Sequence, residues 1–149
     1  FAYIGLLLAI IDYNLMLLPN VIVFSLLVVG IIYISAFNPQ LLLNSTLGAV
    51  SAFLVFYAIY AFYYFVLKRL ALGFGDVKLV FVLGFWCGFK EVPFIFICSA
   101  TLLVAYVLLG CLWSKAKNNI LNQKVPYGPF LIFSAFIALN NPSISSFLC

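Results

Sequence analysis

The chain has 149 residues, of which 68% are hydrophobic and only 7% are charged, and its formal net charge is +4. Soluble domains carry about 25% charged residues, whereas a charge at the centre of a bilayer is costly. The composition therefore excludes a soluble globular domain and indicates an integral membrane protein. In such a chain the basic excess reports first on topology, so we do not take it as a sign of nucleic-acid binding.

The chain starts without a Met at Phe1, inside an apolar run, and apolar runs continue to its end. A removable signal peptide cannot account for them. We therefore expect a fragment or a processed product of a longer protein. The cysteines lack C-x-x-C spacing and the chain has no His, so we expect no metal or haem site.

A helix needs about 20 apolar residues to cross a bilayer. Six apolar stretches come near that length, and in chain order they are 1–18, 21–37, 47–67, 77–89, 93–113 and 125–139. Stretch 77–89 is the shortest, and by length alone it is either a short span or a dip that returns to the same side. Within 47–67, Gly48 and Ala52 stand four residues apart, a spacing that predicts close packing against another helix.

Basic residues decide between these topologies, because cytoplasmic loops collect Lys and Arg. If 77–89 crosses, one face of the membrane holds all but one of them, with Lys90 opposite: Lys68, Arg69, Lys78, Lys115, Lys117 and Lys124. If it does not cross, the basic residues divide almost evenly. The sequence therefore predicts an all-α polytopic membrane protein with about six transmembrane helices, forming a single domain over residues 1–149. Both termini are predicted outside and both aspartates on the cytoplasmic side.

The chain has three acidic residues, Asp12, Asp76 and Glu91. Glu91 falls on the opposite side beside Lys90, where we expect a solvated surface pair. Asp12 and Asp76 share a face, and two carboxylates that approach across a water molecule share one proton. The ionised carboxylate can take a proton from water while the protonated one hydrogen-bonds a carbonyl under attack. This pair would act as an aspartic protease, a chemistry that needs neither His nor metal.

The residues around Asp76 leave two readings open. Gly73 and Gly75 would let the backbone turn sharply and let a substrate strand lie close. Alternatively, Asp76 only caps the N-terminus of the fourth helix. Lys78 would orient a carboxylate or contact substrate, or else extend its side chain to the membrane interface.

Four stretches of the chain resemble motifs of the bacterial type IV prepilin leader peptidases, a family of membrane aspartic proteases. "GFGDVKL" (73–79) fits the pattern GxGDxKL, and "DYNLMLLPN" (12–20) is similar to the first family motif, an Asp followed by Pro and then Asn or Asp. "VPYGPFL" (125–131) resembles the element P-[FY]-G-P, and "LGFWCGFKEVP" (83–93) has the family's Gly, Trp and Gly. The motifs stand in the family's order and span the chain.

The resemblance implies that Asp12 and Asp76 are the catalytic pair. It implies prepilins or pseudopilins as substrates, in type IV pilus assembly or type II secretion, and no nucleic acid as a partner. Their short basic leader would be cut after a Gly on the cytoplasmic side of the bacterial inner membrane. Residues expected to bind substrate or support the site are the other motif positions: Pro19, Asn20, Gly73, Gly75, Lys78, Tyr127, Gly128 and Pro129.

The chain departs from many family members, which begin with paired C-x-x-C motifs and N-methylate the new terminus using S-adenosylmethionine. We therefore expect a peptidase without a cofactor, and S-adenosylmethionine only if a methyltransferase activity is retained. Two other functions remain open. A small proton-coupled transporter or channel would use the same aspartates as a proton relay. A presenilin-like protease would share GxGD but should also carry a P-A-L motif, which the chain lacks.

Overall fold

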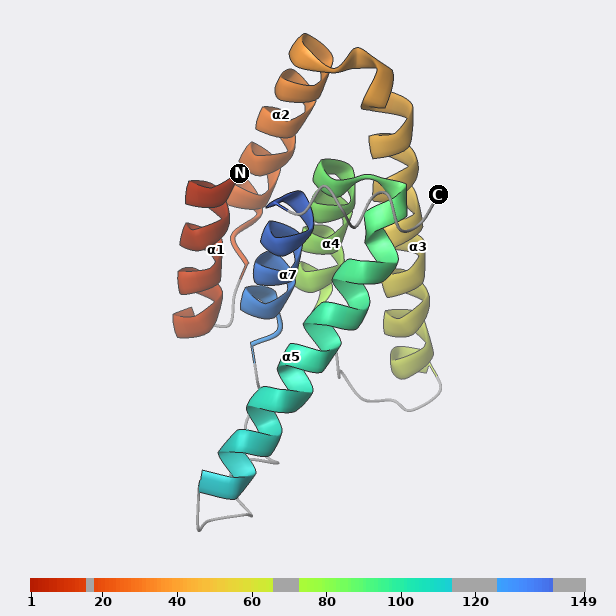
Figure 1. The fold of residues 1–149 in the computed structure, drawn as a ribbon. Coiled ribbons are helices and arrows are strands. Elements are labelled where there is room, and N and C mark those ends of the chain that lie inside the picture. The colour runs from red at the N-terminus through yellow and green to blue at the C-terminus, as the bar shows by residue number, and fades with distance from the viewer. Residues whose placement is uncertain (16–17, 66–72, 114–125, 141–149) are drawn as a thin grey trace.

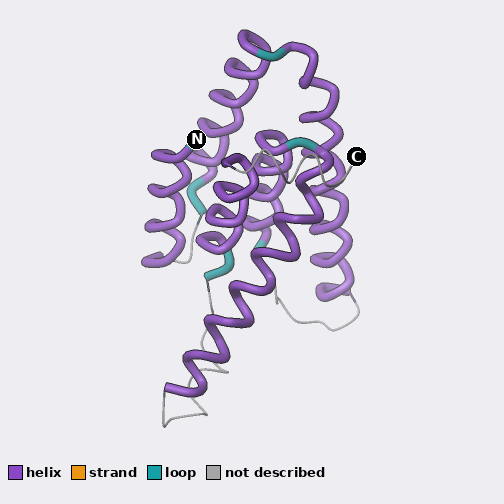
Figure 2. The backbone as a smooth tube through the Cα atoms, viewed as in Figure 1, coloured by secondary structure: helices purple, strands orange, loops and turns teal. Residues whose placement is uncertain are grey.

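A computed structural model describes residues 1–15, 18–65, 73–113 and 126–140, and within these ranges the chain forms α-helices joined by short connections (Figure 1 and Figure 2). Each of the six predicted segments contains an α-helix among the described residues. The helices are α1 (Ala2–Leu15), α2 (Asn20–Phe37), α3 (Leu42–Phe65), α4 (Phe74–Cys87), α5 (Val92–Trp113) and α7 (Gly128–Asn140). Short 3-10 turns at Pro39–Leu41 and Phe89–Glu91 lead into α3 and α5.

The helices alternate in direction, so that the ends of α1, α3 and α5 lie at the same end of the bundle as the starts of α4 and α7 (Figure 1). Three helical stretches among the described residues are long and apolar enough to cross a membrane: Asn20–Phe37, Pro39–Phe65 and Phe89–Gly110. The other apolar helices are shorter. Long and short helices alike expose large hydrophobic side chains on their outer faces, such as Phe24, Ile97 and Phe133, which suits a protein surrounded by lipid.

The centre of the bundle is formed by α4 and α7. Half of α4 is buried, including Leu79 and Leu83, and Leu131 and Ala135 of α7 are fully buried. A helix that is apolar all round is normally enclosed by others. The brevity of stretch 77–89 therefore reflects packing among neighbouring helices, and the structure extends it towards the N-terminus to start at Phe74.

The expected close packing at Gly48 is confirmed, and its partner is α4. A Cβ built on Gly84 would lie 2.6 Å from Gly48 O and 2.8 Å from the Ala52 Cβ. A Cβ on Gly48 would in turn collide with the Gly84 carbonyl oxygen. Small residues thus bring the backbones of α3 and α4 into direct contact.

The Gly, Trp and Gly of stretch 83–93 hold the other end of α4. Trp86 Nε1 donates to Leu26 O of α2 at 3.0 Å, and a Cβ on Gly30 would come within 2.8 Å of the same nitrogen. Gly88 ends α4 with φ of +84°, a conformation that glycine adopts without strain. This Trp therefore joins α4 to α2.

The expectation of a solvated surface pair at Glu91 is wrong. Glu91 is only 7% exposed, and its Oε2 has no hydrogen-bond partner among the described residues. The 3-10 turn that contains it packs against α3. That contact turns the side chain inward, which the position of Glu91 beside Lys90 in the sequence could not indicate.

Most of the basic residues behind the predicted topology lie outside the described residues: Lys68, Arg69, Lys115, Lys117 and Lys124. Lys78 and Lys90 are described. They lie near opposite ends of α4.

We expect Gly84→Val to lower the free energy of unfolding by about 1–3 kcal/mol, because its side chain would press on the Gly48 carbonyl. Reversible unfolding in mixed detergent micelles would measure the change. Ala58→Val, on an exposed face of α3, is the matched control and should change stability little. Equal stability of the two variants would contradict backbone contact between α3 and α4.

Candidate active site

Asp12 lies in the last turn of α1 and is 5% exposed. Its carboxylate accepts a hydrogen bond from a residue far along the chain: Gly128 N–H donates to Asp12 Oδ2 at 3.0 Å. Gly128 is the first residue of α7. The carboxylate therefore meets an unpaired N–H at the positive end of a helix dipole, which stabilises its negative charge.

Tyr127, Gly128 and Pro129 each contribute to the contact between Asp12 and the start of α7. A Cβ on Gly128 would lie 2.5 Å from Asp12 Oδ2, so no larger residue fits without displacing the carboxylate. Pro129 lies in the first turn of α7, where a missing N–H breaks no helical hydrogen bond. Tyr127 O accepts from Leu131 N–H at 3.2 Å and so begins the helix.

Asp76 lies in the first turn of α4 and is partly buried. Gly73 is the N-cap of this helix, and the Asp76 N–H donates to Gly73 O at 3.0 Å. Asp76 is therefore not the N-cap residue itself, but its carboxylate accepts a backbone hydrogen bond from Gly73 and so still caps the start of this helix. Its carboxylate, like that of Asp12, lies at the N-terminal end of a helix, although it belongs to that helix and Asp12 does not.

The two aspartates lie close enough for the charge of Asp12 to act on Asp76. They reach this position from α1 and α4, with α7 supplying the Gly128 N–H. Two like charges that act on each other raise the cost of ionising both carboxyl groups. Within the described ranges, no three Cys, Asp or Glu side chains gather into a possible metal site.

The motif glycines serve a different purpose from the expected sharp turn. Gly73 has an extended backbone with φ of −75°, and Gly75 lies within α4. A Cβ on Gly75 would lie 3.3 Å from the Leu18 Cβ, and one on Gly73 would lie 3.3 Å from Asp76 Oδ2. The Gly75 position is therefore occupied by Leu18, where a substrate strand was expected. The absence of a side chain at Gly75 allows Leu18 to pack on α4 next to Asp76.

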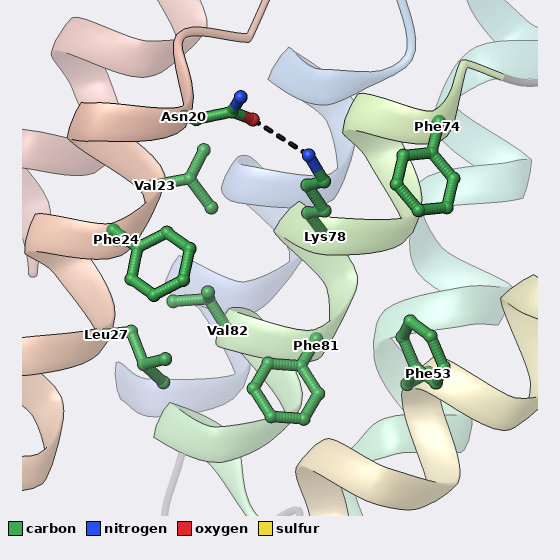
Figure 3. A pocket seen from close by; sticks show the side chains of 9 residues that line it. All are labelled: Asn20, Val23, Phe24, Leu27, Phe53, Phe74, Lys78, Phe81 and Val82. Atoms are coloured by element: carbon green, nitrogen blue, oxygen red, sulfur yellow. Dashed lines mark hydrogen bonds between the residues drawn. The ribbon is translucent and has the colours of Figure 1, made fainter.

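The motifs at 12–20 and 73–79 contact each other through Leu18 and Gly75, and also through Asn20 and Lys78. Pro19 is the N-cap of α2, and Asn20 is the first helical residue. Lys78 Nζ donates to Asn20 Oδ1 at 3.0 Å and lies 5.0 Å from the Phe74 ring centroid (Figure 3). Residues two apart on an α-helix point to nearly opposite sides, so Lys78 does not orient the Asp76 carboxylate.

Lys78 and Asn20 border a cavity of about 350 Å³ between α2, α3 and α4. The rest of its lining is apolar, as Figure 3 shows: Val23, Phe24, Leu27, Phe53, Phe74, Phe81 and Val82. Together with these two polar groups, the lining forms an apolar space with one charged edge.

Tyr127 lies within electrostatic range of Asp76, and its hydroxyl is 2.7 Å from Ser99 Oγ of α5. Sequence reasoning missed Ser99. The available signal was a single serine within the apolar stretch 93–113, but many such serines only bond their own helix.

Comparison with known proteins agrees with the motifs. The model of the type IV leader peptidase family matches residues 1–109, which include Asp12 and Asp76. The chain is 31% identical over 134 residues to a prepilin leader peptidase/N-methyltransferase of Pseudomonas putida, covering 89% of this chain and 45% of the relative. It is 34% identical over 133 residues to that of Dickeya chrysanthemi, covering 89% of this chain and 46% of the relative.

The relative in Escherichia coli K12 bears the same name and is 27% identical over 132 residues, which cover 89% of this chain and 57% of the relative. The chain thus spans about half the length of these curated relatives. No solved structure matches it. On the family match over most of its length, the chain belongs to the type IV leader peptidase family.

Proposed function

We propose that the chain is a membrane-embedded aspartic endopeptidase that removes the short basic leader of type IV prepilins or pseudopilins. Its catalytic pair is Asp12 and Asp76. The observation that carries the proposal is the placement of these two carboxylates: Asp12 in the last turn of α1 and Asp76 in the first turn of α4 lie at the same end of the bundle, although the two residues are 64 positions apart in the chain. Membership of the type IV leader peptidase family supplies the substrate class.

The pair acts on a water molecule held between the two carboxyl groups. The ionised carboxylate takes a proton from this water as it attacks the scissile carbonyl, and the protonated one donates a hydrogen bond to the carbonyl oxygen. The proton then passes to the leaving amine. The Gly128 N–H holds one carboxylate in place, and this fixed donor needs no reorganisation during the reaction.

The other motif residues position the pair or bind substrate. Gly73 and Gly75 let neighbouring groups approach α4, and Pro19 begins α2 beside them. Lys78 and Asn20 border the apolar cavity on the far side of α4. A substrate whose cleavage site precedes a hydrophobic segment suits an apolar space of this kind.

The active end of the bundle faces the cytoplasm in this proposal. The six helices cross the bacterial inner membrane with both termini outside, and the chain forms a single domain. Lys78 at the aspartate end fits the excess of basic residues expected in the cytoplasm. The proposal concerns leader cleavage by this chain and assigns it no cofactor.

We expect Asp12→Asn and Asp76→Asn each to lower leader cleavage by about a hundred- to ten-thousandfold, because each removes one acid–base group. The assay uses purified protein in detergent and a peptide with a basic leader, a Gly and a hydrophobic segment. Glu91→Gln is the matched control, since it alters the third acid at the other end of α4, and it should retain activity. Normal cleavage by either Asn variant would refute the pair.

We expect Gly128→Ala to lower cleavage by about ten- to a hundredfold, because its Cβ would displace a charged hydrogen-bond acceptor. Gly5→Ala is the matched control at the α1–α7 contact. The nearest atom to its Cβ would be Ile132 Cγ2, at 3.1 Å, at the end of a side chain that can move, and the next would be Phe1 Cε1 at 4.0 Å. If both variants cleave at the wild-type rate, the Gly128 contact does not support the reaction.

A further inference from the structure

We propose that Ser99 and Tyr127 act as positioning residues that hold the Asp12 carboxylate in place through the Gly128 N–H. We call this pair the Ser99–Tyr127 clamp. The inference rests on the proposed function, because it assigns the clamp to the leader-cleavage reaction. It concerns residues on α5 and in the turn before α7, whereas the acids themselves are on α1 and α4.

The direction of the clamp's hydrogen bond follows from the number of hydrogens available. Ser99 is fully buried, and its Oγ donates to Phe96 O at 3.1 Å. A serine hydroxyl has one hydrogen, so with that hydrogen on Phe96 the Tyr127 hydroxyl is the donor across the 2.7 Å contact. The tyrosine proton is thus committed to Ser99.

The tyrosine ring contacts α3, whereas its hydroxyl contacts α5. The ring stacks on Phe56 of α3, with centroids 6.1 Å apart and an interplanar angle of 21°. Phe56 stacks in turn on Phe96 of α5 at 4.7 Å and 20°. Ring and hydroxyl together fix Tyr127 against α3 and α5.

This fixed side chain holds the Tyr127 Cα, which is one end of the planar peptide unit that carries the Gly128 N–H. The carbonyl of this unit accepts from Leu131 N–H at 3.2 Å, and its N–H donates to Asp12 Oδ2 at 3.0 Å. The peptide unit is therefore bonded on both sides, and the Tyr127 side chain is its third point of attachment. Loosening that attachment lets the donor drift from the carboxylate.

The clamp acts on the rate of the chemical step and leaves substrate binding unchanged. We expect Ser99→Ala and Tyr127→Phe each to lower kcat by about two- to tenfold with KM unchanged, the effect of losing one neutral hydrogen bond. Because both variants break the same bond, the double variant should have a kcat no lower than that of the more impaired single variant.

Ser134→Ala is the matched control. Ser134 is also fully buried and donates to the carbonyl three residues earlier, Leu131 O at 2.8 Å, but its hydroxyl has no contact with Tyr127. Its kcat should stay at the wild-type value. Thermal unfolding in the same detergent accompanies each assay, and the three single variants should unfold within a few degrees of one another.

Three results would overturn the clamp: equal kcat for Ser99→Ala and Ser134→Ala, losses that multiply in the double variant, or a change confined to KM. These results are distinct from a failure of the proposed function. In that case the wild-type protein would not cleave the peptide, or Asp12→Asn would cleave it normally. A wild type that cleaves, together with unaffected clamp variants, would remove the clamp and leave the catalytic pair.

Discussion

The hydrogen bond from Gly128 N–H to Asp12 Oδ2 joins residues 116 positions apart and connects the first helix of the bundle to the last one described. This one hydrogen bond satisfies two buried polar groups. A carboxylate buried among apolar helices needs a donor, and a helix that begins inside such a bundle needs an acceptor for its first N–H groups. The same contact requires glycine at 128 and brings Asp12 to the end of the bundle where Asp76 lies.

The solvent around the bundle explains why glycines, more than large side chains, determine its packing. Lipid solvates outward apolar side chains as well as the protein interior does, so helices gain little from hiding them. Association then depends on close contact, and α3 and α4 achieve it by placing Gly48 against Gly84. The same arrangement buries α4 between its neighbours and fixes the position of Asp76 in its first turn.

The candidate site was predictable because its residues occur in short local patterns. Alternating helix directions follow from successive apolar stretches, and they bring Asp12 and Asp76 to one end whichever way the bundle faces. The contribution of Ser99 was not predictable in this way. A serine in an apolar helix usually bonds its own backbone, as Ser99 does with Phe96 O. The second contact of Ser99 is with Tyr127, 28 residues later in the chain, and local spacing does not indicate it.

By itself the sequence determined the all-helical architecture, the six apolar segments and the motif residues, because composition and local spacing carry that information. Only the tertiary structure decided what each group touches. It placed Leu18 against Gly75, turned Lys78 towards Asn20, and buried Glu91 against α3. The physical reason is that these contacts depend on which helix faces lie together, and in a chain apolar on almost every face no periodic pattern distinguishes the buried face from the one in lipid.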